Sequence, residues 1–126
     1  MALMTCGSGQ SMAETVAEHL GLSLLPTTET WFACGEGKIE IEANVRGHEV
    51  YIFQSMVGEQ DDRSIYDRFI MLLHAVEAAA LSDAQYITAV TPYYPGARQD
   101  KRKGRTREGI SAGLFARMLQ SAGADR

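Results

Sequence analysis

Hydrophobic residues recur along this chain with a helical spacing in some segments and a strand-like spacing in others. One helical segment covers residues 65–80, where apolar positions follow one another at steps of three, four and one. The apolar face of that segment consists of Ile65, Phe69, Leu72, Leu73, Val76 and Ala80. A last helix is predicted from Ile110, Leu114, Phe115, Met118 and Leu119, and Gly123 is expected to end it.

Other segments have the pattern of strands. Residues 38–42 alternate strictly between charged and apolar side chains, which predicts a half-exposed strand at a sheet edge or in a hairpin. Residues 50–53 form a continuous apolar run, as in strands that are covered on both faces of a parallel sheet. Residues 86–91 predict another buried strand, and residues 22–25 start an extended segment that Pro26 interrupts.

The start of the chain predicts a strand, a glycine-containing turn and a helix, the opening of a βαβ unit. Ser11 stands three residues before Glu14, the spacing of a capping box, and Gly21 is expected to end the helix. We interpret the turn at residues 7–10 as a simple connection. The alternative is that it binds a phosphate at the helix N-terminus.

Two further loops are predicted between these elements. Residues 44–48 predict a turn. Residues 58–62 predict a loop before the long helix, and Asp61 or Asp62 is expected to cap that helix.

Residues 30–37 combine two large aromatic side chains, a thiol and two glycines between predicted extended segments. We interpret Trp31 and Phe32 as core residues. The alternative is that an aromatic side chain beside this glycine-rich turn lies flat on a purine base.

A cationic loop follows the predicted strand at residues 86–91. Six of the twelve Lys and Arg residues lie between Arg98 and Arg107, although the chain carries a net charge of −4. Ligands of open α/β sheets bind beyond the carboxyl ends of strands, and the Arg guanidinium matches phosphate geometry. The loop therefore predicts a site for a polyanion. The alternatives are a solvated charge run and a nucleic-acid arm, and the acidic net charge argues against the second.

The composition is that of one domain in the cytoplasm. The 126 residues, 45% of them hydrophobic, suffice for one core. No apolar run approaches the ~20 residues of a membrane span, and no signal peptide is expected. Cys6 and Cys34 lack metal-ligand spacing and are interpreted as reduced thiols. The isolated histidines predict no metal site and no Ser-His-Asp site.

The predicted last helix raises an expectation about the C-terminus. A crossover helix of a parallel sheet is normally followed by the strand to which it leads. Only Ala124-Asp125-Arg126 follow Gly123. We therefore expect a fold that is truncated at the C-terminus.

Three runs of the sequence together resemble one family. They are Phe32-Ala33-Cys34-Gly35-Glu36, Asn44-Val45-Arg46-Gly47, and Ala97-Arg98-Gln99-Asp100 with the later Arg107-Glu108-Gly109-Ile110-Ser111-Ala112. Their order and spacing resemble ribose-phosphate pyrophosphokinase, or PRPP synthetase, over essentially all 126 residues. The match is to the N-terminal domain. The resemblance implies a single α/β domain over residues 1–126, a Rossmann-like parallel sheet of the phosphoribosyltransferase type with a projecting β-hairpin.

The resemblance implies transfer of a diphosphoryl group from Mg-ATP to ribose 5-phosphate, giving PRPP and AMP, with Mg²⁺ as cofactor. By matching position, Phe32 would stack on the adenine and Glu36 would support the ribose or base side, both in the ATP site of a neighbouring subunit. Arg98 and Gln99 would line the nucleotide site from the other subunit, with Asp100 helping to fix their loop.

The same resemblance implies further sites and partners. Cys34 occupies the base-recognition position, where the family usually has Asp or Asn. Arg46 and Arg107 resemble phosphate-binding residues of a regulatory site that takes phosphate or ADP across a subunit contact. The implied assembly is a dimer-based homo-oligomer, a hexamer in the family, without nucleic-acid or membrane partners.

No catalytic residue is expected within this chain. The family's flexible cationic loop and its Asp-Asp-x-x-x-Thr-Gly-x-Thr ribose-phosphate loop are not found, because Asp61-Asp62 is followed by Arg63-Ser64-Ile65-Tyr66. Ribose 5-phosphate is therefore expected to bind only with the missing domain. The alternative functions are a non-catalytic nucleotide-binding or regulatory subunit that associates with PRPP synthetases, and a nucleic-acid-binding module.

Overall fold

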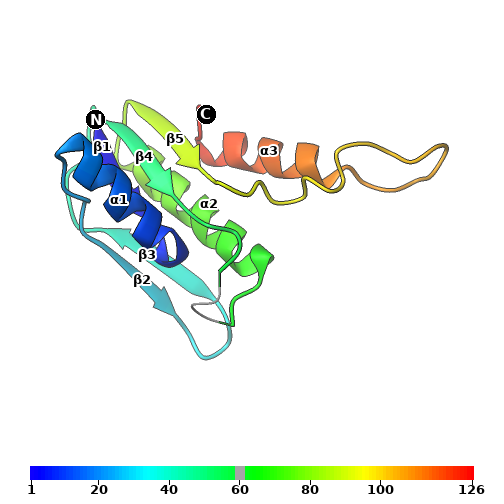
Figure 1. Ribbon diagram of the computed structural model, residues 1–126, viewed down its shortest axis with the longest axis horizontal. Coiled ribbons are helices and arrows are strands. Elements are labelled where there is room, and N and C mark those ends of the chain that lie inside the picture. The colour runs from blue at the N-terminus through cyan, green and yellow to red at the C-terminus, as the bar shows by residue number, and fades with distance from the viewer. Residues whose placement is uncertain (59–61) are drawn as a thin grey trace.

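The computed structural model describes residues 1–58 and 62–126. A parallel sheet in the order β1-β4-β5 consists of β1 (Ala2–Thr5), β4 (Glu49–Phe53) and β5 (Tyr86–Val90). A separate antiparallel hairpin consists of β2 (Thr27–Trp31) and β3 (Gly37–Ile41). Figure 1 shows this hairpin projecting below the parallel sheet. The predicted α/β class, with a parallel sheet and a projecting hairpin, is confirmed.

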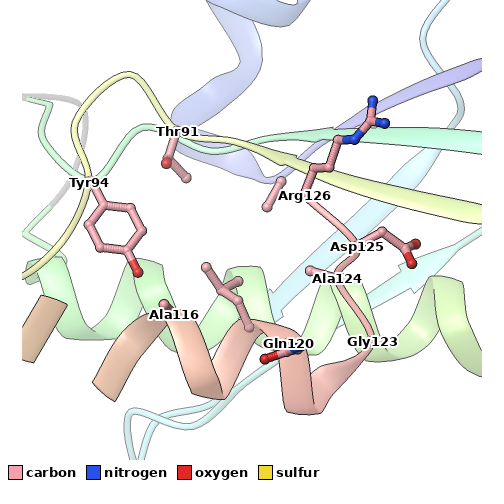
Figure 2. A pocket seen from close by; sticks show the side chains of 10 residues that line it. Thr91, Tyr94, Ala116, Gln120, Gly123, Ala124, Asp125 and Arg126 are labelled. Carbon is pink, nitrogen blue, oxygen red and sulfur yellow. The ribbon is translucent and has the colours of Figure 1, made fainter. Parts of the chain in front are cut away.

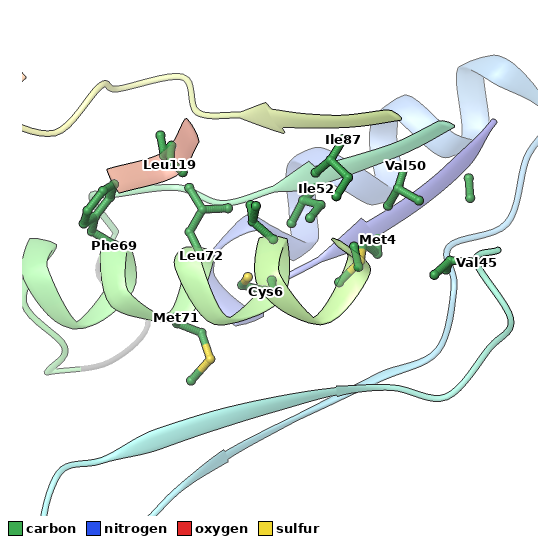
Figure 3. Close-up of a cluster of buried hydrophobic side chains, with 14 of the residues drawn as sticks. Met4, Cys6, Val45, Val50, Ile52, Phe69, Met71, Leu72, Ile87 and Leu119 are labelled. Atoms are coloured by element: carbon green, nitrogen blue, oxygen red, sulfur yellow. The ribbon is translucent and has the colours of Figure 1, made fainter. Parts of the chain in front are cut away.

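Helices cover both faces of the parallel sheet. They are α1 (Gln10–Leu20), which follows a 3-10 turn η1 (Gly7–Gly9), then α2 (Ile65–Leu81) and α3 (Ser111–Ala122). Successive side chains of a strand point to opposite faces. Leu3 and Phe53 accordingly pack with residues of α1, whereas Met4 and Ile52 pack with residues of α2 and α3. Figure 3 shows the second of these clusters.

The central strand β4 matches its sequence pattern. Val50, Ile52 and Phe53 are buried, since neighbouring strands flank β4 and helices cover both its faces. The long helix also follows its prediction, because Phe69, Leu72 and Val76 are buried on its inner face.

The start of α2 differs from the prediction. Ser64 is the N-cap residue: its hydroxyl accepts from the backbone N–H of Asp67, and the Asp67 carboxylate accepts from the N–H of Ser64. This is a capping box. Asp62 is therefore not the cap, because the extended backbone immediately before the helix falls at Ser64, and Asp61 lies outside the described residues.

One prediction near the N-terminus is wrong. The helix begins at Gln10, so Ser11 lies inside its first turn and forms no capping box with Glu14. The 3-10 turn before the helix moves its start, and Gly9 becomes the N-cap residue. The segment predicted at residues 22–25 pairs with β1 through a parallel bridge between Leu24 and Leu3, and Pro26 separates it from β2 as predicted. The expected end of α1 is confirmed, because Gly21 has a left-handed φ of 64°.

The last residues return to the sheet. Gly123, with a φ of 114°, ends α3 as predicted. The Asp125 N–H then donates to the Ile87 carbonyl at 2.8 Å, and the Ala89 N–H donates to the Arg126 carbonyl at 2.8 Å. Residues 125–126 thus lie along the edge of β5 that faces away from β4.

Candidate functional site

The tip of the β2–β3 hairpin presents an aromatic ring, a thiol and a carboxylate to solvent. The Phe32 N–H donates to the Glu36 carbonyl at 2.8 Å, and the Gly35 N–H donates to the Phe32 carbonyl at 2.9 Å. Gly35 has a φ of +92°, which a residue with a Cβ rarely adopts. The resulting tight turn leaves Phe32, Cys34 and Glu36 exposed.

The two aromatic residues of the hairpin have different environments. Phe32 is 48% exposed, so the interpretation of Phe32 as a core residue is wrong. Trp31 is partly buried and packs against the core cluster, which confirms its interpretation. The difference follows from their positions, because Trp31 ends β2 whereas Phe32 lies in the turn beyond it. An exposed aromatic ring can stack on a base, and a carboxylate on the same turn can accept a hydrogen bond from a sugar hydroxyl.

The cationic loop leaves the carboxyl end of β5. Residues 97–110 are all exposed. In Figure 1 they form the long yellow-to-orange excursion before α3. The position beyond the end of a parallel strand is the one predicted for a ligand loop.

Gln99 closes the base of this loop. Its N–H donates to the Gly96 carbonyl at 2.9 Å, and its carbonyl accepts from the Ala112 N–H at 3.3 Å. Its side-chain oxygen accepts from the Ser111 hydroxyl. Arg98 stands directly before this anchored residue and Asp100 directly after it, both exposed. The residues at the loop base are therefore held against the start of α3.

Glu108 organises the far end of the loop. Its Oε1 accepts from the Lys103 N–H at 2.9 Å and from the Thr106 hydroxyl at 2.8 Å. These hydrogen bonds stabilise the ionised carboxylate and hold the pKa of Glu108 below its ordinary value, with the Lys103 N–H as the larger cause. The end of the loop is thus a turn closed by a carboxylate.

We expect this turn to depend on pH. Because the pKa of Glu108 is lowered, the stabilisation of the turn by its ionised carboxylate is fully present above pH 4.5. This stabilisation is lost as the pH falls through the lowered pKa. The chemical shift of the Lys103 amide proton should titrate with a midpoint below 4.5, and Glu108→Gln should abolish the titration. A midpoint at or above 4.5 would show that the carboxylate does not close the turn.

The hairpin tip and the loop base do not meet within one chain. Figure 1 shows the hairpin turn at the lower left and the loop at the far right of the molecule. Phe32, Cys34 and Glu36 therefore form one group, and Arg98, Gln99 and Asp100 form another. A ligand that contacts both groups needs two copies of the chain.

Residues 1–123 match the family model described as the N-terminal domain of ribose phosphate pyrophosphokinase. The chain belongs to this family. The prediction made from the three sequence runs is confirmed.

Curated relatives are similar over the whole chain. Ribose-phosphate pyrophosphokinase 1 of Streptococcus pyogenes serotype M1 is 39% identical over 126 residues, which are 100% of this chain and 38% of that protein. The Streptococcus mutans serotype c protein of the same name is 38% identical over 126 residues, 100% of this chain and 37% of that protein. The chain thus spans less than two fifths of the length of these relatives.

A solved structure is similar in fold. The crystal structure of phosphoribosylpyrophosphate synthetase from Mycobacterium smegmatis matches with a TM-score of 0.90 and 35% sequence identity. The match covers 99% of this chain and 40% of that chain. The hairpin and the parallel sheet thus belong to the pyrophosphokinase N-terminal domain.

The two arginines expected at a regulatory site lie on different segments of this pyrophosphokinase domain. Arg46 belongs to the turn before β4, and its Nη2 lies 3.2 Å from Asp83 Oδ2 in an exposed ion pair. Arg107 lies in the exposed loop after β5. Figure 1 places these segments at opposite ends of the parallel strands, so one chain does not bring the two arginines together.

The glycine turn of the pyrophosphokinase domain already holds an anionic group. The Gly7 N–H donates to Glu29 Oε2 at 2.7 Å. The Ser8 hydroxyl is within 2.6 Å of Gln54 Oε1 and 2.7 Å of the Ser55 carbonyl oxygen. A carboxylate at the turn repels a phosphate, which favours the interpretation of residues 7–10 as a connection.

A cavity that was not predicted lies between β5 and α3. Its volume is about 670 Å³. It is lined by Ala89, Thr91, Tyr94, Ala116, Leu119, Gln120, Gly123, Ala124, Asp125 and Arg126, as Figure 2 shows. The Tyr94 hydroxyl donates to the Ala112 carbonyl at 3.1 Å, and burial raises the pKa of Tyr94. Its walls come from distant segments without a common motif, so sequence reasoning had no signal for it.

Residues 1–58 and 62–126 contain neither a metal-ligand cluster nor a membrane-spanning helix. In this part of the pyrophosphokinase chain, no group of three His, Cys, Asp or Glu side chains could hold a metal ion. None of its helices has the length and hydropathy of a membrane span.

Proposed function

We propose that this chain acts as the N-terminal part of a ribose-phosphate pyrophosphokinase and supplies an ATP half-site and subunit interfaces, with the hairpin tip of one chain and the loop base of another together binding ATP. In the reaction, a diphosphoryl group leaves ATP for the 1-hydroxyl of ribose 5-phosphate, giving PRPP and AMP. The observation that carries the proposal is the exposure of Phe32, Cys34 and Glu36 on a turn remote from their own chain's cationic loop.

The hairpin tip binds the nucleoside. Phe32 is 48% exposed, so its ring is accessible for stacking on adenine. Cys34, on the same turn, faces the polar edge of the base, where a thiol is a weak hydrogen-bonding group. Glu36 accepts a hydrogen bond from the ribose or the base.

The loop base of the neighbouring subunit binds the phosphates. Arg98 offers a planar donor fork to phosphate oxygens, and Gln99 holds Arg98 in place through its contacts with α3. Asp100 follows in the same anchored segment. The cations at residues 101–105 add positive charge to the same loop, which favours binding of a polyanion such as the phosphates of ATP.

The proposed site requires a homo-oligomer. Because one chain keeps its hairpin tip away from its loop, at least a dimer is needed to complete one ATP site. A dimer-based assembly, up to a hexamer, meets this requirement. Ribose 5-phosphate is proposed to bind only when the C-terminal domain of the family is also present.

Mg²⁺ is proposed to arrive with ATP. Magnesium sites often use one or two carboxylates together with substrate phosphates. The described residues do not by themselves form a three-ligand group, so they do not fit a self-contained Mg²⁺ site. The roles above concern binding and orientation by the chain's own side chains.

A regulatory phosphate is proposed to bind between subunits at Arg46 and Arg107. Arg46 already pairs with Asp83, but both side chains are largely exposed, and exposed ion pairs contribute little to stability. A phosphate or the phosphates of ADP can therefore replace Asp83 as the partner of Arg46. In the assembly, Arg107 would come from a second chain.

The Arg98 assignment is tested by comparing two ligands. We expect Arg98→Ala to weaken ATP binding by about 1.5–3 kcal/mol, because a charge-assisted contact is lost, and to leave adenosine binding unchanged. Isothermal titration of the assembled protein measures both affinities. Arg117→Ala, which removes an exposed charge from α3, is the matched control. Equal losses for ATP and adenosine would show that Arg98 does not bind phosphate.

A further inference from the structure

One carboxylate links the hairpin to the turn after β1, besides the packing of Trp31, Ile39 and Ile41 against the core. Glu29, in the middle of β2, accepts from the Gly7 N–H through Oε2 at 2.7 Å. Its other oxygen, Oε1, accepts from the indole N–H of Trp31 at 2.6 Å. One side chain of the hairpin therefore joins the turn after β1 to the residue that precedes Phe32.

Trp31 also contacts residues outside β2. The guanidinium carbon of Arg63, just before α2, lies 4.2 Å from the centroid of the Trp31 ring. Gly37 pairs with Trp31 across the hairpin, and a Cβ at Gly37 would lie 2.8 Å from Trp31 Cζ3 and 2.6 Å from Met71 Cε. The ring thus packs between the hairpin and α2.

These contacts bear on the direction in which the hairpin points. An isolated two-stranded hairpin is marginally stable in water, so its orientation depends on what it packs against. Trp31 is the last residue of β2, so its placement against α2 sets the direction in which the chain enters the turn that begins at Phe32. A carboxylate and a cation that hold one indole ring fix that placement through a charge-assisted hydrogen bond and a cation–π contact.

We propose that Glu29, Trp31 and Arg63 are positioning residues that set the angle at which the hairpin presents its tip to a nucleotide on a neighbouring subunit. None of the three is assigned a contact with the nucleotide. The effect on nucleotide affinity rests on the function proposed above, whereas the effect on hairpin orientation does not.

The orientation is measured by the distance between two spin labels. Cys34 is exposed at the hairpin tip, whereas Cys6 is buried, and burial raises the pKa of the Cys6 thiol, so Cys34 is labelled selectively. Glu18→Cys places the second label on the exposed face of α1. Dilution with unlabelled chain makes distances within one chain dominate. Pulsed electron paramagnetic resonance then reports the distance distribution between tip and helix.

We expect a single narrow distribution in the parent chain and a broadened or shifted one in Glu29→Gln. The Gln amide keeps the shape of the side chain but replaces one carboxylate oxygen by an NH₂ group. This group cannot accept the hydrogen bond that either the Gly7 N–H or the Trp31 indole N–H donates to Glu29. Arg63→Met, which removes the cation and keeps an apolar side chain, should act in the same direction. Glu40→Gln is the matched control on β3, because Glu40 is exposed and faces Lys38. Distributions in both test variants that equal the control would overturn the proposal.

The second readout is affinity in unlabelled protein. Glu29→Gln should weaken ATP and adenosine binding to the same extent, by about tenfold, because misplacement of a binding group affects the whole nucleoside. Arg98→Ala should weaken only ATP. Trp31 is the only tryptophan of the chain, so its fluorescence reports on the environment of the network in each variant.

The outcomes separate the two proposals. If the parent chain binds no nucleotide, the proposed function fails, and the label distances still decide whether Glu29 positions the hairpin. If the distances change but both affinities stay at the parent value, the claim that this network serves the nucleotide site is wrong. Circular dichroism and thermal unfolding confirm that each variant is folded before either comparison.

Discussion

Replacement of Gly9 by alanine is expected to destabilise the domain strongly, whereas the same replacement at Gly109 is not. A Cβ at Gly9 would lie 2.4 Å from the carbonyl oxygen of Phe53 and 2.6 Å from its carbonyl carbon. It would also lie 2.7 Å from the Thr5 hydroxyl. Both neighbours belong to strands of the parallel sheet, so the clash cannot be relieved by rotating one flexible side chain.

The expected cost is about 3 kcal/mol or more, at the upper end of what overpacking causes, because backbone must move. Domains of this size have a total stability of about 5–15 kcal/mol, so the loss is a large part of it. Urea unfolding measures the difference. Gly109→Ala is the control, since a Cβ there meets only open space. Equal midpoints for the two variants would contradict the close approach of η1 to β4.

The 126-residue chain on its own is expected to form no PRPP. Its described residues include a candidate ATP site but no counterpart of the family's ribose-phosphate motif, because Arg63-Ser64-Ile65-Tyr66 follows Asp61-Asp62. Without a second substrate held in place, the positioning that accounts for much of such catalysis is lost. The expected difference from a full synthetase is therefore many orders of magnitude in rate.

The measurement is AMP and PRPP formation from Mg-ATP and ribose 5-phosphate. The chain is assayed alone, with a separately produced C-terminal domain, and with a full-length synthetase. A normal enzymatic rate from the chain alone would contradict the prediction. If the chain changes the rate of the full-length enzyme without adding activity of its own, it acts instead as a regulatory subunit.

The sequence predicted the elements whose patterns are local. The face of α2 and the alternation of β3 were both recognisable, because burial on one side imposes a period on the sequence. The cap at Ser64 is also encoded in the sequence as Ser-x-x-Asp, but Asp61 and Asp62 have the same capping chemistry a few residues earlier. The true start of α1 was not recognisable, because it depends on the contact between Gly9 and β4.

The candidate site was predictable to a similar extent. The exposed loop after β5 followed from the charge pattern and from the strand before it. The exposure of Phe32 did not, because composition alone favours a large aromatic residue in the core. The contact between Glu29 and Gly7 joins residues 22 positions apart and has no local signature.

The central claim is that one ATP site combines the hairpin tip of one chain with the loop base of another. Phe32→Ala should weaken nucleotide binding by about 1–3 kcal/mol through lost stacking. Arg98→Ala should weaken ATP binding by a comparable amount. If the two residues of one site come from different chains, a mixed dimer of the two variants has one site that carries neither substitution and one site that carries both.

The deciding measurement is an ATP titration of the two variants mixed in equal amounts and allowed to exchange subunits. Random mixing makes about half of the dimers mixed, and each of these has one intact site, so about a quarter of all sites should recover the affinity of the unaltered protein. Recovery at that level, absent from either variant alone, is the predicted result. No recovery after verified subunit exchange would contradict a site shared between chains.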